Sequence, residues 1–153
     1  MKPVTVSVNV PNSREEVYAF LDVLANHESF TDHLMVDWQL SGPRSGVGAR
    51  AQVRVHAKLS NERIDIEVIE ADPPHRIVEE DVSAKGRRQT RGTYVLEKLP
   101  DGGTNISFEF AWLEAPRNER LAAPLMRLFM RRANGKAMRR LAKQLNQGSS
   151  GKP

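Results

Sequence analysis

The sequence contains no cysteine, and this absence removes several kinds of site from consideration. Without thiols the chain can form neither disulfide bonds nor cysteine zinc sites, and it has no thiolate nucleophile. A chain of 153 residues buries about 68–70% of its unfolded surface, so it needs no such cross-link to fold. We therefore expect a single domain over residues 1–147, followed by a disordered tail over residues 148–153.

Long apolar runs are also missing. No stretch of about 18 apolar residues occurs, so no segment is expected to cross a membrane as a helix. The first ten residues alternate polar and apolar side chains and lack the apolar centre of a signal peptide. Together these features predict a cytoplasmic protein.

The motifs of metal, nucleotide and serine-hydrolase chemistry are absent as well. The glycines of GVG (residues 46–48) are not followed by GK[ST], so they form no phosphate-binding loop. The four histidines (His27, His33, His56 and His75) lie at no metal-ligand spacing, and neither HExxH nor GxSxG occurs. We expect no metal, no cofactor and no nucleophilic catalysis.

Charge is distributed unevenly along the chain. Residues 1–116 contain 13 basic and 18 acidic side chains, whereas residues 117–153 contain 10 basic side chains and one acidic. The positive net charge therefore belongs to the C-terminal quarter of the protein.

Alternation of apolar and polar residues predicts a series of strands. The first covers residues 4–10; after it Ser13 and Glu16 form a capping box that begins a helix over 14–25, with a short helical segment over 27–34. Six further strands follow, close to residues 36–40, 50–56, 63–68, 76–83, 94–96 and 106–112. Because short turns join consecutive strands, the pattern predicts an α+β fold with a seven-stranded antiparallel sheet.

A long basic helix ends the chain. Proline is tolerated only in the first turn of a helix, so Pro124 places its start near residues 121–123, with a separate turn over 117–122. At 100° per residue one stripe faces the sheet: Ala122, Met126, Met130, Ala133, Ala137, Leu141 and Leu145. Small alanines and flexible methionines leave space for a cavity, unless large side chains of the sheet fill it.

An apolar group and a basic face of this helix allow several partners. Leu121, Leu125, Leu128 and Phe129 are predicted to pack on the N-terminal helices; alternatively, they form a lip that contacts a membrane, a donor protein or a second subunit. The basic face is expected to be solvated, and the next alternative is peripheral contact with a membrane. Nucleic-acid binding is not favoured, because the helix lacks exposed stacking aromatics apart from Phe129.

Over residues 3–146 the sequence resembles the START-like (SRPBCC) superfamily, in particular its polyketide cyclase/dehydrase-type members. The resemblance is carried by VSVNVPNSREEVYAFL, the glycine loop SGPRSGVG, the turn ADPPHR, the hairpin PDGGTNISFEF and the long C-terminal helix. It implies a helix-grip fold, in which a curved sheet wraps the helix and encloses a cavity for lipids, polyketides or other hydrophobic molecules. Some members catalyse cyclisation or dehydration in that cavity.

Three functions are therefore considered: binding or transport of a hydrophobic small molecule, catalysis of the aromatase, cyclase or dehydratase kind, and a toxin-type or regulatory interaction through the basic helix. For catalysis we expect Glu80, in phase with Val78 and Val82, and Tyr94. If the strand over 76–83 bulges or is flipped, Glu79, Glu80 and Asp81 lie in water instead. The predicted ligand-binding residues are Trp38, Val53, Val55, Ile66, Val78, Phe108, Phe110, Trp112, Met126, Met130, Ala133 and Ala137.

Overall fold

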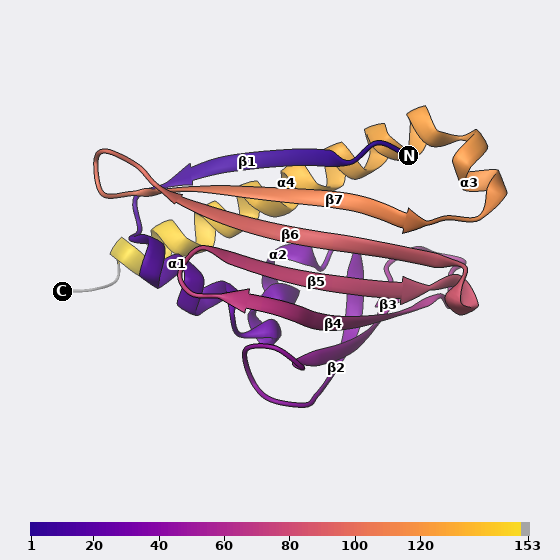
Figure 1. The fold of residues 1–153 in the computed structure, drawn as a ribbon, viewed down its shortest axis with the longest axis horizontal. Helices are drawn as coiled ribbons and strands as arrows, with labels where there is room; N and C mark the ends of the chain where they lie inside the picture. Colours follow the sequence, from indigo (N-terminus) through magenta and orange to yellow (C-terminus); the bar gives the residue numbers. More distant parts are fainter. Residues whose placement is uncertain (151–153) are drawn as a thin grey trace.

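A computed structural model describes residues 1–150, in which seven antiparallel strands form one sheet. The spatial order is β1-β7-β6-β5-β4-β3-β2, so the first strand pairs with the last (Figure 1). The strands are β1 (Val4–Val10), β2 (Met35–Ser41), β3 (Arg50–Val55), β4 (Arg63–Asp72), β5 (Arg76–Ser83), β6 (Arg88–Lys98) and β7 (Thr104–Glu114). The predicted α+β helix-grip architecture is confirmed.

Two helices and a 3₁₀ turn follow β1. Helix α1 (Arg14–Leu21) begins at Ser13, whose hydroxyl accepts a hydrogen bond from the Glu16 backbone N–H at 3.2 Å. The predicted helix over 14–25 thus ends four residues early and continues as η1 (Leu24–His27) and α2 (Glu28–Thr31). A further 3₁₀ turn, η2 (Ala84–Gly86), joins β5 to β6.

The C-terminal segment forms α3 (Arg117–Leu121) and α4 (Ala123–Ser150), with the break at the predicted position before Pro124. In Figure 1, α4 runs behind the sheet, and its main contact with a strand is with β1. Helix α4 includes residues 148–150, which were predicted to be disordered; residues 151–153 lie outside the described part. We call the sheet face turned toward α4 the inner face.

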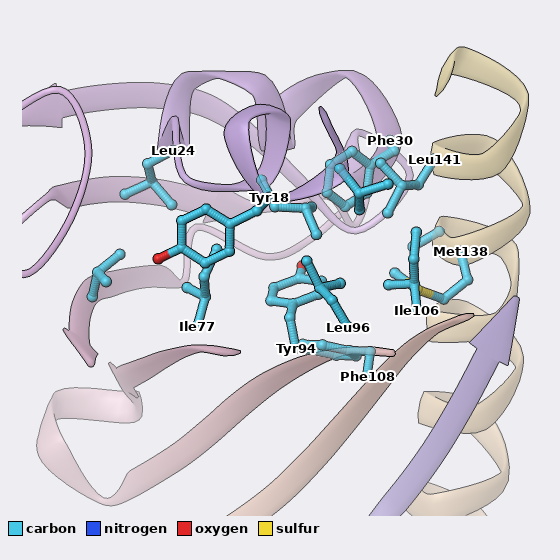
Figure 2. Packing of buried hydrophobic residues seen from close by; sticks show 14 of the residues in the cluster. Tyr18, Leu24, Phe30, Ile77, Tyr94, Leu96, Ile106, Phe108, Met138 and Leu141 are labelled. Atoms are coloured by element: carbon cyan, nitrogen blue, oxygen red, sulfur yellow. The ribbon is translucent and has the colours of Figure 1, made fainter. Parts of the chain in front are cut away.

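Buried polar contacts fix the second half of α4. The Asn12 side chain donates to the Leu145 carbonyl at 3.1 Å, and Thr104 donates to the Asn12 carbonyl at 2.8 Å. These bonds tie the ends of β1, β7 and α4 together. A packed core of aromatic and aliphatic side chains lies between the sheet and the second half of α4. Met138 and Leu141 of α4 belong to this core together with Ile106 of the sheet (Figure 2).

The edge strand β2 is interrupted by a bulge. Asp37 has a left-handed backbone (φ 57°), and the pairing with β3 shifts between Val36 and Gln39. In a regular strand, residues three apart point to opposite faces, but the bulge turns Met35 and Trp38 to the same side. The simple alternation predicted for this strand is wrong, and Leu40 is 52% exposed.

Within the described residues, no helix is both long enough and apolar enough to cross a membrane.

Candidate functional site

A cavity of about 270 Å³ lies between the inner face of the sheet, α2 and α4. An apolar cavity of about 150 Å³ holds a benzene molecule, so this volume suits a guest of one or two rings. Nine of the predicted site residues line it: Trp38, Val55, Tyr94, Phe108, Phe110, Trp112, Met126, Met130 and Ala137. The predicted space beside the alanines and methionines of the helix is therefore present, although large aromatic residues occupy part of it.

Three predicted ligand-binding residues lie elsewhere in the interior. Val53 and Ile66 belong to the buried core cluster and do not line the cavity. Ala133 is buried on α4 and does not border the cavity, because neighbouring Asn134 and Met130 take that position.

Two further predictions fail because β5 faces the other way. Ile77 pairs with Tyr94, and Glu79 pairs with Gly92, so the odd-numbered residues of β5 lie on the inner face. Val78 is buried on the outer face beside Thr93, and Glu80 forms an outer-face ion pair with Arg91. The strand is flipped as in the alternative interpretation, yet Glu79 and Asp81 enter the cavity instead of water.

Glu79 and Asp81 form the acidic end of the cavity. Burial raises the pKa of the Glu79 carboxyl well above its usual range, and the neighbouring Asp81 raises it further. Burial likewise raises the pKa of Asp81 to about 7, against a weak hydrogen bond from Thr90 that lowers it. Oxygen atoms of both carboxyls, Glu79 Oε2 and Asp81 Oδ1, are buried without a hydrogen-bond partner in the protein.

His27 lies beside this pair. Its Nε2 is 2.8 Å from the Leu21 carbonyl, which can only accept, so Nε2 carries the proton and Nδ1 is an acceptor. Nδ1 lies 3.8 Å from Glu79 Oε2, which is too long for a hydrogen bond. Burial lowers the His27 pKa to about 4, so the imidazole in this contact is neutral at neutral pH.

Tyr94 and Phe108 form the aromatic wall next to the acidic end. Their ring centroids are 4.7 Å apart, and Figure 2 shows the two rings side by side. Burial, followed by the charges of Glu79 and Asp81, raises the Tyr94 pKa well above its usual range, so its hydroxyl stays protonated. Gly92 makes room for this wall, because a Cβ there would lie 2.9 Å from two carbons of the Phe108 ring.

Two donors line the other walls of the cavity without a protein partner. They are the indole Nε1 of Trp38 and the amide Nδ2 of Asn134. Asn134 is only 5% exposed, and an unpaired buried amide costs about 1–3 kcal/mol. Four unsatisfied polar atoms around one cavity indicate that a bound molecule or water completes their hydrogen bonds.

Arg88 borders the cavity but is fully engaged. It bonds Glu62, Ser83 and Glu119, and Glu119 in turn belongs to α3. These partners raise the pKa of its guanidinium. Arg88 thus fastens α3 to the sheet and leaves no free positive charge for the two carboxyls.

Sequence reasoning missed Glu79, Asp81, His27 and Asn134. Ile77 was the available signal for Glu79 and Asp81. As an apolar residue it indicates that the odd positions of β5 point inward, just as strongly as Val78 indicates this for the even positions. His27 and Asn134 carried no signal, because a single polar residue on an amphipathic helix gives no indication of burial.

The first half of the C-terminal segment carries an exposed apolar patch, which we call the α3–α4 patch: Leu121, Leu125, Leu128 and Phe129. These side chains are 44–87% exposed, so the prediction that they pack on the N-terminal helices is wrong. The N-terminal helices contact the later turns of α4, through bonds from Arg140 and Gln144 to the Ser29 carbonyl. Phe129 also lines the cavity, so the patch adjoins its mouth.

A family model described as "Polyketide cyclase / dehydrase and lipid transport" matches residues 1–146. A search of curated proteins found no match. The sequence resemblance to this group is thereby confirmed over nearly the whole chain.

Solved structures share the fold at low identity. The Thermus thermophilus protein TTHA0849 superposes with a TM-score of 0.76 at 18% identity, covering 97% of this chain and 99% of that one. A point mutant of norcoclaurine synthase from Thalictrum, in complex with a transition-state analogue, gives a TM-score of 0.72 at 13% identity over 97% and 96%. DynU16, a putative protein of the dynemicin biosynthetic locus, gives 0.67 at 19% identity over 97% of this chain and 48% of its own.

Proposed function

Because the chain belongs to the polyketide cyclase/dehydrase and lipid transport family, we propose that it binds a hydrophobic small molecule of one or two rings in the cavity beneath α4. The observation that carries this proposal is a cavity with apolar and aromatic walls whose few polar atoms lack partners. Such a site offers area for desolvation and fixed groups for orientation. Binding and transport of such a molecule require no catalytic group.

Titration with 2-ethylnaphthalene, followed by calorimetry and by the fluorescence of Trp38 and Trp112, tests the proposal. The expected result is saturable binding that the substitution Ala137→Phe weakens at least about tenfold, because the added ring fills the cavity. Ala19→Phe, on the exposed side of α1, is the matched control and should bind as the parent does. Met126→Trp provides a second filling variant if the first unfolds. Equal affinity in all variants would place the probe outside the cavity and overturn the proposal.

A second candidate function is acid–base catalysis, favoured by the paired carboxyls next to Tyr94. A carboxyl with a pKa of about 7 is half ionised near neutral pH and is suited to remove a proton. Glu79, whose pKa burial raises well above its usual range, is the candidate to donate a proton to a leaving hydroxyl, so that water is lost and a double bond forms. The residues proposed for this reaction are Asp81, Glu79 and Tyr94. Asp81 takes the place of Glu80, which was expected from the sequence.

Dehydration of a naphthyl β-hydroxyketone to its conjugated enone tests this candidate by absorbance. Asp81→Asn should abolish turnover, whereas Glu80→Gln, on the outer face of the same strand, should leave the rate unchanged. A rate that neither substitution alters would exclude catalysis by this carboxyl pair.

For a macromolecular partner, we propose an anionic membrane surface in contact with the α3–α4 patch. Exposed Arg131 and Arg132 flank the patch on α4, and Arg117 and Arg120 flank it on α3. Apolar side chains beside cations suit the boundary between lipid tails and acidic headgroups. A ligand would then pass between membrane and cavity past Phe129.

A further inference from the structure

Among the described residues, the acidic end of the cavity contains acceptors and no free cation. Among the residues that border it, the titratable ones are His27, Glu62, Glu79, Asp81, Arg88 and Tyr94. Arg88 is held by Glu62, Ser83 and Glu119, and His27 is neutral at physiological pH. The two buried carboxyls therefore face no positive charge in the described protein.

From this arrangement we propose that the ligand carries a protonated amine, which binds between Glu79 and Asp81 while its rings occupy the aromatic part of the cavity. The inference rests on the proposed ligand-binding function and specifies the chemistry of the ligand. An acidic cluster alone would not support it. The independent observations are the cavity itself and the buried, unpartnered amide Nδ2 of Asn134, which is 5% exposed and borders that cavity.

The geometry matches an ammonium group better than a neutral donor. Glu79 and Asp81 are two residues apart on one strand, so their Cα atoms lie roughly 7 Å apart on the same face. An ammonium has three N–H donors, and this end of the cavity supplies three acceptors: the two carboxylates and His27 Nδ1. A neutral hydroxyl would use only one of them and would compensate no charge.

The walls add a second attraction. Tyr94, Phe108, Phe110 and Trp112 present ring surfaces around the same cavity, and the faces of aromatic rings attract cations. A ligand carboxylate would meet the opposite situation, since it would approach two carboxyls in an apolar site without an available cation. The cavity therefore selects amines over acids of the same shape.

Binding is expected to release a proton. Burial raises the pKa of Asp81 to about 7, so at and below this pH part of the unliganded carboxyl is protonated, while an alkylamine in solution is already an ammonium. Formation of the ion pair converts the carboxyl to a carboxylate, and its proton passes to the buffer. Binding should accordingly tighten as pH rises toward the pKa of Asp81, about 7.

Three probes of one size test the inference: 2-(1-naphthyl)ethylamine, 1-ethylnaphthalene and 1-naphthylacetate. We expect the amine to bind at least about tenfold more tightly than the hydrocarbon and the acid to bind most weakly. Calorimetry of the amine at pH 6 in two buffers of different ionisation enthalpy should report net proton release, because most of Asp81 is protonated below its pKa of about 7. The acid binding as tightly as the amine would overturn the inference.

Glu79→Gln and Asp81→Asn should each remove the preference for the amine over the hydrocarbon, whatever their effect on the hydrocarbon itself. Glu80→Gln is the matched control, because Glu80 is the neighbouring acid on the outer face and pairs with Arg91. It should keep the full amine preference. If the hydrocarbon binds without any preference for the amine, only this inference fails; if none of the three probes binds, the proposed function fails with it.

Discussion

The ring of Phe108 lies directly over the backbone of Gly92, on the inner face of neighbouring strands. A methyl group on Gly92 would overlap two ring carbons at 2.9 Å and press on Glu79 Cγ at 3.2 Å. Both residues belong to the wall of the cavity. The absence of one side chain thus determines where the ring lies and how much space remains beside the carboxyls.

Gly92→Ala should therefore reduce the free energy of unfolding by about 1–3 kcal/mol and weaken binding of 2-ethylnaphthalene, because the ring must move into the cavity. Chemical denaturation and the titration described above measure the two effects. Gly135→Ala is an informative control: its only close neighbour is the flexible end of Arg139, and alanine favours a helix by about 1 kcal/mol. The two glycines should respond with opposite signs; destabilisation by both would contradict the assignment.

The acidic end predicts a specific pH dependence of stability. Asp81 has a pKa of about 7 in the folded protein and 3.8 as its ordinary value, so the folded state holds a proton that the unfolded state has lost. The contribution of Asp81 to the free energy of unfolding is highest below about pH 4 and declines as pH rises toward 7. Asp81→Asn should remove this decline. Denaturation from pH 4 to 7 measures the difference in unfolding free energy between parent and variant. A difference that does not change with pH would mean that Asp81 faces water.

His27 acts in the opposite direction. Its pKa falls from 6.5 to about 4 on folding, so the unfolded state binds a proton first as pH is lowered. This group destabilises the fold progressively between pH 6.5 and 4. His27→Gln, whose amide can still donate to the Leu21 carbonyl, should lessen the acid sensitivity. An unchanged acid limb would indicate that His27 is accessible to water in the folded protein.

Packing under the later turns of α4 should be sensitive to truncation. Leu141 is fully buried against the sheet, and Leu141→Ala is expected to cost about 2–5 kcal/mol of unfolding free energy. Leu121 belongs to the same C-terminal segment but is 87% exposed, so Leu121→Ala should change stability by less than about 0.5 kcal/mol. Thermal and denaturant unfolding compare the pair; similar costs would mean that Leu121 is also packed.

Membrane contact is tested by co-sedimentation with vesicles of phosphatidylcholine, with and without phosphatidylserine. Binding should require the anionic lipid, weaken as salt is added, and fall in the double variant Leu125→Ser, Phe129→Ser. Val47→Ser replaces an equally exposed apolar side chain in the β2–β3 loop and should have no effect. Equal binding to neutral vesicles, or loss with the Val47 variant, would contradict a specific role of the α3–α4 patch.

The strongly periodic elements could be predicted from the sequence. The valines of β1 and the proline at the start of α4 each have one consistent structural interpretation. Strand β5 does not, since Ile77 and Val78 place apolar residues in both phases. Only its pairing with β6, where Tyr94 lies opposite Ile77, determines that Glu79 points inward and Glu80 outward. Register is a long-range property, and a single strand does not contain it.

The boundary between core and cavity was equally inaccessible. Val53 and Val55 lie on the same face of the same strand, yet Val53 belongs to the buried core and Val55 lines the cavity. The sequence of the strand does not show which of them borders open space. The bulge at Asp37 also escaped prediction, because a left-handed aspartate has no distinctive sequence pattern of its own.

That bulge bears on solubility as well as on the placement of Trp38. Strand β2 is an outermost strand of the sheet, where unpaired N–H and C=O groups could recruit a strand from another molecule. The irregular backbone between Val36 and Gln39 breaks this row into two short pieces. A second copy would find few consecutive partners along β2, so the same irregularity that builds one cavity wall also disfavours strand pairing at this edge of the sheet.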